Sequence, residues 1–241
     1  MNFENTDVWG FKHALRGMRN PKNSWDKSDS GTNYDCINGC REDCPHLNMD
    51  CDEEYCDEFR IGQNDMKLAQ TLIKAGNEHR KFMRQIFVSV DITAPLYWWK
   101  EFDTYKVGTV ANSTSTMHKI TSQPITLDCF EVDDYDGNVD CGINEIGNEC
   151  IGVEFEEIFI TQLEYLRQKY LETKDKRYWK ELIRWLPESW LQKRTITMNY
   201  ENIRNMYFQR KNHKLTEWSE SFIKWVESLP YAEDLIMYDG K

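Results

Sequence analysis

Three polar residues near the C-terminal end of the chain suggest a binding site. Asn199, Asn205 and Arg210 lie on one segment with helical periodicity, and the span from Asn199 to Arg210 covers eleven residues, about three turns. We therefore expect the three side chains to point roughly the same way. An arginine beside two amides suits an anionic ligand with a hydrogen-bonding ring. Taken singly, Asn199 is equally typical of a helix N-cap and Arg210 of a solvated charge.

A run of short polar side chains forms a second candidate site. It follows the most aromatic segment of the chain, in which Pro95 suits the first position of a helix and Trp98, Trp99 and Phe102 cluster behind it. Short hydroxyl and amide side chains compete for backbone hydrogen bonds, so the run is poor core and poor helix material. We expect a loop that faces a ligand, and the alternative is a turn without one. The run consists of Thr109, Asn112, Ser113, Thr114, Ser115 and Thr116.

Charge and motifs exclude several classes of protein. The 241 residues carry a net charge of −11, which argues against nonspecific electrostatic binding to the phosphates of nucleic acid. There is no apolar run of about eighteen residues and no signal peptide, so we expect a cytoplasmic protein without a membrane partner. The G-x-S-x-G, P-loop, G-x-G-x-x-G and H-E-x-x-H motifs are absent.

The elements that must position these residues are mostly helices. The alternation of Ile86, Val88, Val90 and Ile92 predicts a half-buried strand over residues 85–93. Asn64 is a plausible N-cap of a helix that ends at Gly76, and a short extended piece covers 195–198. This balance predicts an α+β fold. Further helices are expected near 13–19, over 155–171, 177–187 and 199–211, and around Trp218 to Val226.

The stretch from His13 to Gly31, a short helix followed by a loop, carries Arg16, Arg19 and Lys22 close to the turn at Asn20-Pro21. These cations indicate either a solvated helix end or a loop over an anion site. His79, just before the predicted strand, is by itself most simply a surface histidine.

Two inserts interrupt the pattern. The first, at about 32–60, holds five cysteines spaced C-x3-C-x3-C-x6-C-x4-C, starting at Cys36. This spacing permits zinc, but we favour a reduced insert without metal, and a disulfide framework is not the first interpretation. The second, at about 128–152, is acidic. Its stretch "DDYDGNVD" resembles a calcium loop only loosely, and we interpret it as solvated.

Two segments together resemble the flavin-dependent thymidylate synthase family. "NYENIRNMYFQR", from Asn199 to Arg210, resembles its C-terminal signature, and Leu186-Pro187 precedes it at the family distance of twelve residues. "HRKFMRQIFVSVDITAPLYWWKEF" resembles the family's histidine, the following strand and the next helix. The resemblance covers roughly residues 64–119 and 180–226.

The chain departs from this family's R-H-R-x-x-S-x-N-E-x-S-x-R signature. Thr104, Tyr105 and Lys106 stand in place of Arg-His-Arg, and Thr109 stands at the first serine. Three arginine positions of the family are lost, and they correspond to Thr104, Met117 and Ile183, with Arg184 beside the last. His118, Lys119, Arg16 and Arg19 are candidates to replace the lost charge.

The resemblance implies one domain over 1–241, with a mainly antiparallel sheet flanked by helices, assembled as a homotetramer. It implies FAD as cofactor, NADPH and methylene-tetrahydrofolate as co-substrates, and dUMP or a related pyrimidine nucleotide as substrate. Arg210 and Ser115 would be catalytic, with Arg210 polarising the uracil. The flavin would be bound by His79, Thr104, Tyr105, Lys106, Asn112, Asn199 and Asn205. The nucleotide would be bound by Glu101, Ser115, His118, Arg184 and Arg210.

The sequence thus favours a divergent enzyme that methylates a nucleotide reductively. Two alternatives remain open, a non-catalytic homologue that binds nucleotide or flavin, and an interaction protein stabilised by metal.

Overall fold

The structure is a computed structural model that describes residues 1–32, 59–132 and 151–240, with only the backbone considered for 151–157. The chain forms two compact units. Unit 1 comprises residues 1–6, 90–106 and 110–196, and unit 2 comprises 7–89, 107–109 and 197–241. The single domain expected over 1–241 stays a prediction.

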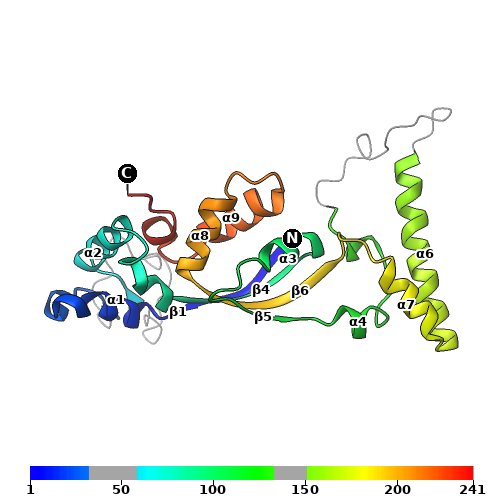
Figure 1. The fold of residues 1–241 in the computed structure, drawn as a ribbon, viewed down its shortest axis with the longest axis horizontal. Helices are drawn as coiled ribbons and strands as arrows, with labels where there is room; N and C mark the ends of the chain where they lie inside the picture. Colours follow the sequence, from blue (N-terminus) through cyan, green and yellow to red (C-terminus); the bar gives the residue numbers. More distant parts are fainter. Residues whose placement is uncertain (33–58, 133–150, 241) are drawn as a thin grey trace, which may run out of the picture. The chain divides into compact units, whose positions relative to one another are not determined.

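A four-stranded sheet has the strand order β1-β4-β6-β5 (Figure 1). Its strands are β1 (Asn2–Trp9), β4 (Phe87–Pro95), β5 (Val110–Ser113) and β6 (Leu191–Asn199). The combination of helices with an antiparallel sheet confirms the predicted α+β class. The sheet contains two strands that the sequence pattern did not predict, β1 and β5.

Strand β4 forms where the alternation predicted it, although it starts and ends two residues later than expected. Val88, Val90 and Ile92 are fully buried, whereas the residues between them are half-buried. Side chains of a strand alternate between the two faces, so every second residue packs into the core. Strand β6 extends well beyond the predicted piece at 195–198, because it also includes the half-buried polar residues from Gln192 to Arg194.

In unit 1, strand β4 leads into helix α3 (Leu96–Phe102). Pro95 is the N-cap and not the first helical residue, a difference of one position. The predicted aromatic cluster is confirmed, since Trp98, Trp99 and Phe102 are buried. The centroid of the Trp98 ring lies 4.9 Å from that of Trp99 and 5.1 Å from that of Phe102. The same unit holds the short helix α4 (Thr116–Lys119).

Helices α6 (Ile151–Thr173) and α7 (Lys176–Arg184) pack against each other in unit 1 (Figure 1). Near their contact, Arg167 donates to Glu164 at 2.7 Å, and the Ile125 N–H donates to the same carboxylate at 2.8 Å. Hydrogen bonds from Arg167 and from the Ile125 backbone together lower the pKa of Glu164 to about 2, although burial opposes the shift.

We expect this unit to lose stability in acid through Glu164. Its folded pKa lies below its unfolded value, so its contribution is fully present above about pH 4.5 and disappears as the pH falls toward 2. The difference in free energy of unfolding between the wild type and Glu164→Gln should therefore shrink between about pH 6 and pH 3. Urea titrations check it. Glu172→Gln, which removes an exposed pair with Lys169, should show little change at either pH.

Unit 2 contains the remaining helices. These are α1 (Phe11–Arg19), α2 (Gln63–Lys74), α8 (Tyr200–Arg210) and α9 (Ile223–Glu227). Shorter helical turns cover Asn20–Lys22, Trp25–Lys27 and Arg80–Gln85, and single π-helical turns cover Glu217–Phe222 and Ala232–Ile236. The last predicted helix therefore begins with a π-helical turn.

The N-cap predicted at Asn64 is wrong. Helix α2 begins after Gly62, and its first N–H groups are capped from a distant segment. The carboxylate of Asp29 accepts from the N–H groups of Asn64 at 2.9 Å and Asp65 at 3.1 Å. A cap supplied 35 residues away leaves no local signal in the sequence.

Most of both inserts lies outside the described residues, including the five clustered cysteines and the calcium-like stretch. The ends of the first insert are paired, since β2 (Gly31–Thr32) and β3 (Phe59–Arg60) form an antiparallel ribbon. None of the described helices is long and apolar enough to cross a membrane.

Candidate functional site

Asn199 begins helix α8 as a capping residue, which is the alternative role that the sequence left open for it. Its side-chain oxygen accepts from the Asn202 N–H at 3.0 Å, and the Asn202 side chain accepts from the Asn199 N–H at 3.4 Å. The two asparagines thus form a reciprocal capping box. Asn199 is only 8% exposed, and its amide nitrogen Nδ2 donates to no residue in the described part of the chain.

Asn202 also holds the loop formed by residues 107–109. Its Nδ2 donates to the Val107 carbonyl at 2.7 Å. Gly108 follows with φ +79°, and a Cβ built on it would lie 2.7 Å from the Asn202 Oδ1 and 3.0 Å from the Asn199 Nδ2. The loop therefore approaches the start of α8 so closely that a side chain at position 108 would displace the capping asparagines, and the positive φ also favours glycine there.

We expect Gly108→Ala to lower the free energy of unfolding by about 1–2 kcal/mol, because φ is positive and the new methyl group meets the asparagines. Urea titration measures the loss. Gly76→Ala is the control for φ alone, since Gly76 has φ +105° and open space around its Cβ position. Gly31→Ala has neither problem and should stay within about 0.5 kcal/mol of the wild type. A loss no greater than that of Gly76→Ala would contradict the close approach.

The first half of α8 contacts the segment before β4. Glu201 is 6% exposed and accepts from Arg80 at 3.3 Å and from Arg84. Arg80 also donates to the Asn205 Oδ1 at 3.3 Å. These contacts hold the 3-10 turn at Arg80–Gln85, which follows His79, against α8.

The prediction that Asn199, Asn205 and Arg210 share one face is wrong for Asn205. Six residues from Asn199 correspond to about one and two-thirds turns, which places Asn205 roughly 120° from it. The contacts agree, since Asn205 accepts from Arg80 whereas the Arg210 guanidinium lies over the Trp218 ring, 4.8 Å from its centre. That ring contact holds the Arg210 charge in place.

His79 lines a cavity of about 600 Å³ within unit 2. The cavity lies between the end of α1, the turn at Asn20–Lys22, one side of α2 and the segment from Glu78 to Gln85. Its lining combines apolar side chains such as Leu72 and Phe82 with His79, the cations Lys22 and Lys81 and the carboxylate of Glu78. A concave, mostly apolar site with a few polar groups is the usual form of a cofactor site.

The structure places the other predicted site residues in unit 1. Thr104 donates to the Glu101 carbonyl at 2.7 Å, and Lys106 is exposed. Asn112 lies on the exposed strand β5. Ser115 caps α4 and accepts from the His118 N–H at 3.4 Å.

The hydroxyl run lies on the surface and not in the core, as predicted, but the loop expected there is wrong for Val110–Ser113, which form strand β5. Thr114 and Thr116 contact strand β6, through the Lys193 carbonyl at 3.1 Å and the Gln192 side chain at 3.2 Å. Arg184 is half exposed and paired with Glu181.

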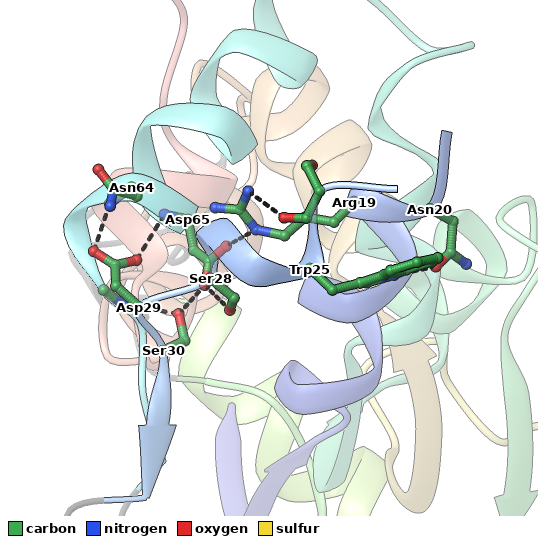
Figure 2. Close-up of polar contacts among 10 residues, drawn as sticks. Arg19, Asn20, Trp25, Ser28, Asp29, Ser30, Asn64 and Asp65 are labelled. Carbon is green, nitrogen blue, oxygen red and sulfur yellow. Dashed lines mark hydrogen bonds and ion pairs between the residues drawn. The ribbon is translucent and has the colours of Figure 1, made fainter. Parts of the chain in front are cut away.

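Arg19, proposed above as a replacement for a lost phosphate arginine, is paired with a buried carboxylate. Its Nε donates to Asp65 at 2.5 Å, and the Ser28 and Ser30 hydroxyls donate to the same carboxylate at 2.6 and 2.5 Å (Figure 2). Burial alone would raise the pKa of Asp65, but the two serines and Arg19 outweigh it and keep the pKa below its usual value. The Arg19 charge is therefore balanced inside the protein, while Arg16 and Lys22 remain exposed.

Two residues that shape this site were not predicted from the sequence. Asn202 holds the loop of residues 107–109 through its hydrogen bond to Val107. Its position three residues after Asn199 is the spacing of a capping box, so the sequence did contain a signal for it. Glu201 left no such signal, because its partners Arg80 and Arg84 lie more than a hundred residues away. No metal-binding cluster of three or more His, Cys, Asp or Glu side chains is found among the described residues.

Comparison with known proteins bears on the fold. No family model matches the chain, and no curated protein does. Two crystal structures of the flavin-dependent thymidylate synthase ThyX from Helicobacter pylori, complexed with FAD and dUMP, are similar to it over their whole length. This chain has their fold. Both have a TM-score of 0.61; the identities are 13% and 15%, with 99% and 100% of this chain and 98% of each ThyX chain covered.

Proposed function

We propose that this protein binds FAD and methylates dUMP, or a related pyrimidine nucleotide, reductively, with methylene-tetrahydrofolate and NADPH as co-substrates. The observation that carries the proposal is the full-length likeness to ThyX structures complexed with FAD and dUMP. We further propose a cytoplasmic homotetramer.

Two features of unit 2 support a flavin as the cofactor. The His79 cavity offers apolar side chains beside an imidazole. Asn199, which lies outside this cavity lining and is 8% exposed, has an amide nitrogen that donates to no described residue. In unit 2, we assign flavin contacts to His79 and Asn199, and separately to Asn205, which lies on another face of α8. In unit 1, Lys106 is the one cation of the Thr104–Lys106 triplet that we assign to the cofactor. When bound, the flavin supplies the electrons that reduce a transferred methylene group to methyl.

Arg210 is the residue we assign to polarising the pyrimidine. Its charge is held over the Trp218 ring, and a fixed cation stabilises negative charge on a bound ring without reorganising. Ser115, Glu101, His118 and Arg184 would contact the nucleotide, and Asn112 and Tyr105 the cofactor.

An absorbance spectrum tests the cofactor. We expect the purified protein to retain added FAD at about one per chain after removal of the excess, and His79→Ala to lose most of it. His13→Ala, which removes an exposed histidine of α1 outside the cavity lining, is the matched control and should retain FAD. A wild-type protein that retains no FAD would refute the proposal.

A non-catalytic homologue is the second candidate, favoured by the loss of three family arginines at Thr104, Met117 and Ile183. In the structure Met117 is 53% exposed, and its side chain carries no charge. A methylation assay with dUMP, methylene-tetrahydrofolate and NADPH decides between the two. FAD retention without methylated product from dUMP or dCMP would favour the second.

A further inference from the structure

A second cavity of unit 2 has a lining that the proposed function does not use. It has a volume of about 560 Å³ and shares no lining residue with the His79 cavity. One face of α1 forms part of it, through Lys12, Arg16 and Arg19. Trp25 and Phe59 line it as well.

The described lining is cationic although the chain as a whole is acidic. Lys12 and Arg16 stand four residues apart on α1, so their side chains lie on the same helix face. Both are exposed, and neither forms an ion pair with a described residue. No described carboxylate lines the cavity, because Asp65 is buried against Arg19.

Arg19 gives the cavity a donor that is fixed in place. Its side chain is only 5% exposed, with Nε bound to Asp65 at 2.5 Å and Nη1 bound to the Ser24 carbonyl at 3.1 Å (Figure 2). Nη2 donates to no residue in the described ranges. Since the hydroxyls of Ser28 and Ser30 also bind Asp65, the guanidinium is held from several sides.

Trp25 provides an aromatic wall. It is 48% exposed, and its ring is fixed by a hydrogen bond of 2.9 Å from Nε1 to the Asn20 Oδ1 (Figure 2). A fixed indole face stacks on a planar ring, while two cations one turn apart attract a dianion. The volume lies within the range of small-ligand sites.

We propose that this cavity is a second ligand site, which binds a small aromatic phosphate ester. Lys12 and Arg16 contact the phosphate, Arg19 donates to it from the cavity wall, and Trp25 stacks on the ring. The site is separate from the one assigned to FAD.

Calorimetric titration of the full-length protein with phenyl phosphate tests this. We expect binding, and an affinity at least about tenfold lower for Lys12→Gln/Arg16→Gln. The matched control, Lys27→Gln/Lys67→Gln, removes two exposed cations outside the lining and should change the affinity less than about twofold. Trp25→Leu should weaken phenyl phosphate and leave inorganic phosphate unchanged.

Three results would overturn the proposal. They are no binding at about 10 mM phenyl phosphate, an equal loss in both double variants, and no effect of Trp25→Leu. FAD retention separates this outcome from failure of the proposed function, because Lys12 and Arg16 lie outside the His79 cavity and their loss should leave FAD binding intact.

Discussion

Replacing Asp65 by alanine should cost about 3–5 kcal/mol of the free energy of unfolding. The Asp65 side chain is fully buried and accepts from Arg19, Ser28 and Ser30. Its removal leaves the Arg19 charge, itself 5% exposed, without an ion-pair partner among the described residues of unit 2. Urea unfolding followed by tryptophan fluorescence measures the loss.

Two further variants make this prediction specific. Asp26→Ala removes an exposed carboxylate from a nearby helical turn and should stay within about 0.5 kcal/mol of the wild type. Arg19→Met/Asp65→Leu should regain much of the lost stability, because it removes both charges and leaves no uncompensated ion. If Asp65→Ala were no worse than Asp26→Ala, the buried pair would not be important for stability.

The largest effect in unit 1 is expected for Trp98→Ala, at about 3–5 kcal/mol. Trp98 is fully buried, and its ring packs against Trp99 and Phe102. Truncation removes a large apolar surface from this contact and leaves a cavity.

Trp185→Ala is the matched control for Trp98, since the Trp185 side chain is 57% exposed. It removes the same number of atoms and should cost less than about 1 kcal/mol. Urea titration of both variants, with far-ultraviolet circular dichroism to confirm the fold, decides the matter. An equal loss in the free energy of unfolding for Trp98→Ala and Trp185→Ala would contradict the importance of the aromatic cluster for stability.

The sequence predicted those features whose signal is local. Strand β4 was found from its alternation, α8 from its N-cap Asn199, and the aromatic cluster from its spacing within α3. Each of these depends on residues within one element. Strand β1 was missed because Asn2–Trp9 is mostly exposed and polar, so it lacks the alternation that marks a half-buried strand.

The rest of the candidate site depends on contacts between distant segments. Asp29 caps α2 and Glu201 pairs with Arg80, yet neither partner can be inferred from spacing. Arg19 is a further residue whose partner the sequence pattern does not predict. It was a plausible anion ligand in the sequence, whereas in the structure its charge is balanced by Asp65, 46 residues away. Periodicity assigns a side chain to a face but not to a partner.

The ribbon of β2 and β3 has a consequence for how this chain can vary. Gly31 pairs with Arg60 and Thr32 with Phe59, so the points where the chain departs and returns are joined by a ladder of their own. A connection between two points already held together costs little more when it lengthens, about 0.6 kcal/mol per doubling. Insertions, deletions or a grafted peptide between Thr32 and Phe59 should therefore be tolerated by the scaffold. The ribbon makes this position a natural place for the chain to acquire new sequence without rebuilding its sheet.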